Sequence, residues 1–71
     1  MSRRADPETP MADDIVIWCE PDGTYRIVGG GPPPTVVGRH EWRSALAEAQ
    51  VRAHLGKPIW ARHPDGTTHR I

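Results

Sequence analysis

Two copies of the tripeptide Pro-Asp-Gly, at residues 21–23 and 64–66, constrain the fold of this chain more than any other feature. Each copy lies between two short runs rich in β-branched and aromatic residues. Proline sets φ for the first corner of a turn, aspartate bonds the backbone ahead of it, and glycine adopts the positive φ that follows. Such a turn between two strand-like runs predicts a β-hairpin. The sequence therefore predicts two similar hairpins.

The segment between the hairpins predicts a loop and then one helix. Glycines and prolines at 29–38 disfavour a helix, because glycine loses much entropy on ordering and proline lacks an amide donor. Within this loop, residues 35–37 are compatible with a short extended piece. Residues 41–55 are rich in alanine and long unbranched side chains, and Gly56 with Pro58 forms a stop signal. We expect a helix over 41–55.

The apolar residues of the predicted helix form one narrow stripe. At 100° per residue this stripe contains Trp42, Ala45, Leu46, Ala49 and Ala53. Its small volume allows the helix to lie close to a sheet. The expected fold is therefore α+β, with the order ββαββ. Both hairpins would join in one antiparallel sheet of about four strands, with the helix packed on one face.

Val51 and Leu55 fall almost opposite this stripe. Two isolated apolar residues on a surface need no explanation. The alternative is a second contact face for another chain, which a short chain would use to bury additional area. Val51 and Leu55 are therefore candidate oligomer contacts.

The length of 71 residues allows a single domain, which we place at 15–71. Residues 1–14 are polar, contain prolines and show no periodicity, so we expect a disordered tail. No apolar run follows its two arginines, and no stretch approaches the roughly 20 apolar residues of a membrane helix. Cys19 is the only cysteine, which excludes an intrachain disulfide and fits a reducing compartment. These features predict a cytoplasmic protein that does not bind a membrane.

Strand alternation assigns the hairpin residues to two faces. Ile15, Ile17 and Cys19 share one side of the first hairpin, and Ile59 and Ala61 share one side of the second. We expect this side to face the helix. The opposite side would then carry a set of large and basic side chains, which are Trp18, Arg26, Trp60, Arg62 and Arg70.

Three interpretations of this second face remain open. The arginines shield the indoles by cation–π contacts, or the face binds another protein or a second copy of the chain, or it binds nucleic acid by base stacking and phosphate pairing. A charge of +2 over residues 15–71 is only mildly basic. An inverted assignment would bury both tryptophans and remove the last two interpretations.

The reactive residues do not form a recognisable catalytic or metal-binding pattern. His63 and His69 lie six residues apart across a turn, but no second local pair completes a zinc site. Cys19 is expected on the core side, and Asp22 and Asp65 are explained by their turns. We therefore predict no enzyme activity, no metal or cofactor and no small-molecule substrate. The expected function is a small interaction module that is a homodimer or binds another protein, with weak nucleic-acid binding as the alternative.

Residues 15–71 also resemble a family of short bacterial and phage proteins known as domain of unknown function 2188. The similarity depends on an Asp-Gly turn followed by an aromatic residue, on helix alanines four apart and on a late Asp-Gly turn. Here these are Asp22-Gly23 with Tyr25, Ala45 with Ala49, and Asp65-Gly66. The sequence departs from the family at Trp60 and in its long glycine–proline loop. The resemblance implies a ββαββ fold and no particular activity.

Overall fold

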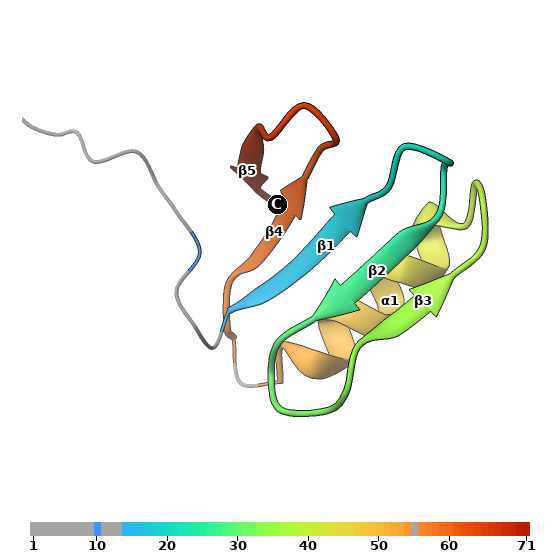
Figure 1. The fold of residues 1–71 in the computed structure, drawn as a ribbon. Helices are drawn as coiled ribbons and strands as arrows, with labels where there is room; N and C mark the ends of the chain where they lie inside the picture. Colours follow the sequence, from blue (N-terminus) through green and yellow to red (C-terminus); the bar gives the residue numbers. More distant parts are fainter. Residues whose placement is uncertain (1–9, 11–13, 55) are drawn as a thin grey trace, which may run out of the picture.

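The computed structural model describes residues 10, 14–54 and 56–71. The described elements are β1 (Ile15–Cys19), β2 (Tyr25–Val28), β3 (Thr35–Val37), α1 (Trp42–Arg52), β4 (Ile59–Arg62) and β5 (Thr68–Arg70). The strands form one sheet in the order β3-β2-β1-β4-β5, and α1 lies across one of its faces (Figure 1). This confirms the α+β class with a single helix. Of the predicted disordered tail at 1–14, only residues 10 and 14 are described, and Leu55 lies outside the described residues.

Both hairpins form as predicted, but they are joined in parallel. β1 and β2 are antiparallel, as are β4 and β5, whereas Ile15 of β1 pairs with Ile59 of β4 in a parallel register. The sheet is therefore mixed, and the expectation of antiparallel pairing throughout needs correction at this junction. The reason is β3, which extends the first hairpin by one strand. It leads the chain into α1 at the end of the sheet where β1 finishes, so the helix returns the chain to the end where β1 starts.

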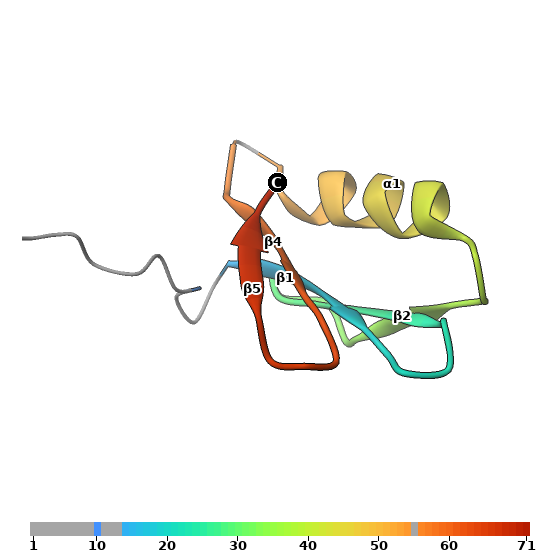
Figure 2. The same cartoon turned by 90° about the horizontal axis from the view of Figure 1, so that it is seen from above.

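The core lies between α1 and strands β1 and β2. Ile15, Ile17 and Ile27 are fully buried and pack against the small side chains of Ala45 and Ala49, which are also fully buried. Each buried isoleucine stabilises the fold by about 1.5–3 kcal/mol. The predicted helix stripe is confirmed, and so is the predicted inner face at Ile15, Ile17 and Ile59, whereas Ala61 is buried outside this cluster. Figure 2 shows that α1 covers this face only, so the opposite face of the sheet has no second layer among the described elements.

The helix is shorter at its C-terminal end than predicted. It ends at Arg52, and the N–H of Ala53 closes its last turn on the carbonyl of Ala49 at 2.8 Å. The N–H groups of Gly56 and Lys57 then both donate to the carbonyl of Ala53, at 2.9 and 3.1 Å. Gly56 has a φ of 86°, the left-handed conformation expected of a stop signal.

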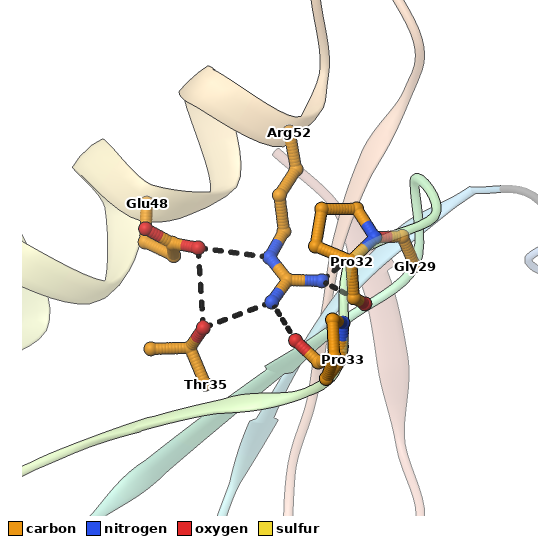
Figure 3. Close-up of polar contacts among 6 residues, drawn as sticks. All are labelled: Gly29, Pro32, Pro33, Thr35, Glu48 and Arg52. Carbon is orange, nitrogen blue, oxygen red and sulfur yellow. Dashed lines mark hydrogen bonds and ion pairs between the residues drawn. The ribbon is translucent and has the colours of Figure 1, made fainter.

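Arg52 connects the end of α1 to the glycine–proline loop (Figure 3). Its side chain is buried although it carries a charge, with 6% of the residue exposed. Buried guanidinium groups require partners for their N–H donors, and Arg52 has five. They are Glu48 at 3.0 Å from Nε, the carbonyls of Gly29 at 2.8 Å and Pro32 at 3.0 Å from Nη1, and the carbonyl of Pro33 and the hydroxyl of Thr35 at 2.9 Å from Nη2.

Two of the three consecutive glycines are required by close contacts. A Cβ on Gly29 would overlap the carbonyl oxygen of Asp14, and a Cβ on Gly30 would lie 2.9 Å from Cδ1 of Ile15 and 3.0 Å from the carbonyl oxygen of Arg52. Both residues have positive φ, 104° and 78°. The loop therefore passes close to β1 and to the end of α1 because no side chain intervenes.

Candidate interaction surface

The two Pro-Asp-Gly turns have the same hydrogen-bond pattern. In the first, the N–H of Gly23 donates to the carbonyl of Glu20 at 3.0 Å, and the N–H and hydroxyl of Thr24 both donate to the carboxylate of Asp22, at 2.9 and 2.7 Å. Asp22 is fully exposed, and these two bonds, the hydroxyl bond first, lower the pKa of its carboxyl group.

The second turn repeats this geometry. The N–H of Gly66 donates to the carbonyl of His63 at 2.9 Å, and Thr67 donates from its N–H and its hydroxyl to Asp65, again at 2.9 and 2.7 Å. The pKa of Asp65 is lowered too, first by the backbone bond and then by the hydroxyl bond. Each turn thus contains a threonine after its glycine that fixes the aspartate.

The parallel pairing of β1 with β4 places these turns side by side. Parallel strands finish at the same end of a sheet, so both turns lie at that end, and the returning strands β2 and β5 lie on opposite sides of the β1–β4 pair (Figure 1). A groove of about 320 Å³ lies between the turns. We call it the turn groove; it is lined by Trp18, Cys19, Glu20, Pro21, Arg62, His63, Pro64 and Gly66.

The sheet face opposite α1, which we call the open face, carries the predicted contact residues Trp18, Arg26, Trp60, Arg62 and Arg70. Their alternation with the buried isoleucines and the register of the strands confirm the predicted face. Trp18 is the register partner of both Arg26 on β2 and Arg62 on β4. The centre of this face is therefore an indole between two arginines.

Both arginines stack on the indole. The guanidinium carbon of Arg62 lies 4.7 Å from the ring centroid of Trp18, and that of Arg26 lies 5.7 Å from it. Such cation–π contacts contribute about 0.5–1 kcal/mol each at exposed sites. Arg26 also forms an ion pair with Glu20 at 3.4 Å. Among the described residues, Arg62 and Arg70 have no ion pair.

Trp60 belongs to the open face but is not available to a partner in this structure. Only 4% of it is exposed, and its indole N–H donates to the carboxylate of Asp14 at 3.0 Å. Its register partner Val16 is buried as well, although neither belongs to the core cluster under α1. The structure thus brings Trp18, Arg26 and Arg62 together, places Arg70 as an exposed arginine on β5, and removes Trp60 from the contact set.

The helix contacts proposed from the sequence are only partly described. Val51 is 73% exposed, whereas Leu55 falls outside the described residues. A single exposed valine is ordinary for a protein surface, so the described residues do not form a second apolar face on α1.

Cys19 and His63 line the turn groove, and His69 contacts His63. His63 and His69 stack at a centroid distance of 5.0 Å, with Nε2 of His63 3.3 Å from Nδ1 of His69. No group of three or more potential ligands converges within the part of the chain that the structure describes. Burial, together with the neighbouring Glu20, raises the pKa of the Cys19 thiol, which makes it a poor nucleophile at neutral pH.

Sequence reasoning missed Asp14 and Arg52. Asp14 was assigned to the tail, and no local pattern connects it to Trp60, which is 46 residues away. Arg52 offered a weak signal, because on a helical wheel it falls about 20° from Ala45 at the edge of the apolar stripe. Its partner Glu48 lies one turn earlier, a spacing that is also common on exposed helix faces.

Comparisons with protein-family models, with curated proteins and with solved structures find no match to this chain. The resemblance to domain of unknown function 2188 therefore stays a prediction. No helix among the described residues has the length and apolar character needed to cross a bilayer.

Proposed function

We propose that this chain is a small non-catalytic interaction module that binds an acidic segment of another protein through its open face. The observation that carries the proposal is the half-buried Trp18, with Arg26 and Arg62 stacked on it, on a sheet face that none of the described helices or strands covers. Tryptophan and arginine are the residues that contribute most to protein–protein binding when they are clustered and partly desolvated.

Charge supports an acidic partner over a second copy of the chain. The open face carries Arg26, Arg62 and Arg70, and the last two have no ion pair among the described residues. Two such faces in contact would oppose arginines of one copy to arginines of the other, which is unfavourable. An acidic segment would instead supply the missing counter-charges.

The state of the indoles makes nucleic acid the weaker candidate. Binding to single strands depends on aromatic rings on which bases can stack. Trp18 is already stacked with guanidinium groups, and Trp60 is buried. With a charge of only +2 over residues 15–71, the domain also lacks the large basic excess that such binding uses.

The proposal is tested by selecting a phage-displayed library of random peptides on the wild-type protein. We expect the enriched peptides to be acidic. They should bind the double variant Arg62→Glu/Arg70→Glu at least about tenfold more weakly, because two attractive charges become repulsive. Arg43→Glu, which changes an exposed arginine on α1, is the matched control and should bind normally. Peptides that do not distinguish the double variant from the control would contradict the proposal.

Sedimentation separates the alternatives. We expect a monomer at both about 50 mM and about 500 mM salt, without binding of a single-stranded oligonucleotide at either. A dimer that persists at both salt concentrations would favour self-association. Oligonucleotide binding that falls steeply with salt would favour the nucleic-acid function. A monomer that binds neither the oligonucleotide nor any selected peptide would leave the arginines with a shielding role only.

A further inference from the structure

The turn groove has a composition suited to a particular kind of ligand group. Its volume of about 320 Å³ is at the lower end of the range for ligand sites, which is enough for one or two side chains. Its walls come from both turns, with Pro21 on one side and Pro64 with Gly66 on the other. Trp18 and Arg62 form the part that continues onto the open face. The groove is therefore part of the proposed binding surface.

Within the groove, Arg62 is the cation that lacks an anionic partner. Glu20 also lines the groove, but its carboxylate is paired with Arg26 at 3.4 Å. His63, the other basic group of the lining, is in contact with His69. Arg62 has the ring of Trp18 as its contact and makes no ion pair among the described residues. Among the described residues, the positive charge of Arg62 is therefore not compensated by an ion pair.

Among the described residues, the guanidinium group of Arg62 makes no hydrogen bond or ion pair in addition to its contact with Trp18. A cation–π contact uses the flat face of the guanidinium group, whereas the N–H donors that bind a carboxylate in a two-pronged geometry lie at its edge. Stacking also limits the conformations of the side chain before binding, which reduces the entropy lost when an anion binds.

We infer that the turn groove binds a glutamate or aspartate side chain of the partner segment, with its carboxylate on Arg62 and an adjacent apolar residue against Pro64 and the indole of Trp18. This inference rests on the proposed function and specifies where on the surface an acidic side chain of the partner segment binds. The groove binds one carboxylate between apolar walls, and the other arginines of the open face attract the acidic segment by their positive charge.

The probe is a pair of capped hexapeptides of prolines and glycines that differ only in one central residue, glutamate in one and glutamine in the other. Each is titrated into ¹⁵N-labelled protein and followed by two-dimensional NMR. The glutamate peptide should shift the indole N–H of Trp18 and the amide signals of Cys19 and Gly66. The indole N–H of Trp60, which is buried and bonded to Asp14, is an internal control that should not shift. The glutamine peptide should bind at least about tenfold more weakly, because it lacks the charge-assisted bonds.

Two variants distinguish the groove from the face as a whole. Arg62→Gln and Arg70→Gln each remove one positive charge from the open face, but only Arg62 lines the groove. We expect Arg62→Gln to weaken binding of the glutamate peptide at least about tenfold. Arg70→Gln should weaken it less than about twofold, because the Arg70 charge is screened by solvent and salt. Arg62→Lys keeps the charge without the planar fork and should give an intermediate loss.

The outcomes separate this inference from the proposed function. Equal losses for Arg62→Gln and Arg70→Gln would overturn the groove as the site while leaving binding by the face intact. The absence of any shift with the glutamate peptide, while library-selected acidic peptides still bind the open face, would have the same meaning. Failure of the library selection itself would reject the proposed function. The NMR spectrum of each free variant reports whether it remains folded.

Discussion

The indole N–H of Trp60 donates a hydrogen bond of 3.0 Å to the carboxylate of Asp14, 46 residues earlier in the chain. This bond ties the residue immediately before β1 to the strand that pairs with β1 in parallel. Only 4% of Trp60 is exposed, so the bond supplies an acceptor to an indole N–H that is buried.

Asp14→Ala should therefore destabilise the protein by about 1–3 kcal/mol, because the buried indole N–H loses its acceptor. The measurement is the free energy of unfolding in urea. Trp60→Phe and the double variant Asp14→Ala/Trp60→Phe complete a double-mutant cycle, in which we expect a coupling of about 1 kcal/mol. A coupling of zero would mean that the bond contributes nothing to stability.

Replacement of Arg52 should be among the most damaging changes in the chain. Arg52→Met removes the charge but leaves the carbonyls of the glycine–proline loop and Glu48 without their donor (Figure 3). We expect the free energy of unfolding, measured in urea, to fall by about 3–5 kcal/mol, which is the range for breaking a buried charged pair. Arg43→Gln on the exposed side of α1 is the control and should change stability by less than about 0.5 kcal/mol. Equal effects of the two substitutions would show that the Arg52 network is dispensable.

The adjacent glycines of the loop should differ in their tolerance of alanine. Both Gly30 and Gly31 have positive φ, which costs alanine about 1–2 kcal/mol. A Cβ on Gly30 also meets Ile15 and the backbone of Arg52, whereas a Cβ on Gly31 meets nothing within 4 Å. Gly30→Ala should therefore be more destabilising than Gly31→Ala by about 1–3 kcal/mol, the usual cost of overpacking. Thermal unfolding by circular dichroism compares the two variants, and equal melting temperatures would contradict the close contact.

The turn aspartates should make stability depend on acid pH. The pKa of Asp65 is lowered in the folded protein by its bonds from Thr67. Its contribution to stability is therefore present above the ordinary aspartate pKa, near 3.9, and is lost as the pH falls through the lower folded value. Thr67→Ala removes the hydroxyl bond and should raise the pKa of Asp65 toward its ordinary value.

Carbon-13 NMR of the Asp65 carboxyl group during an acid titration measures this shift. Thr68→Ala, one residue further along the chain, is the matched control and should leave the titration unchanged. An unchanged Asp65 titration in Thr67→Ala would show that the hydroxyl bond does not stabilise the charged carboxylate.

Much of the fold was predictable because it follows from local chemistry. The two turns, the alternation of Ile15 and Ile17 with Trp18, and the alanine stripe of α1 each depend on residues close together in the chain. The conformation of such segments is limited by turn geometry and by the periods of strands and helices. The same reasoning predicted the outward direction of Trp18, Arg26, Arg62 and Arg70.

The arrangement of these pieces depended on contacts between distant residues. Whether residues 35–37 pair as a strand decides the direction in which the chain enters the helix, and hence whether β4 runs parallel to β1. That pairing in turn places the two turns beside each other and creates the groove between them.

The sequence alone determined the two turns, the two faces of the sheet and the apolar stripe of the helix, because each depends on the spacing of residues along the chain. Only the tertiary structure decided the parallel join of the hairpins, the burial of Trp60 against Asp14 and the role of Arg52. The physical reason is that these three depend on burial and hydrogen bonds between residues far apart in sequence, whose geometry no local period records.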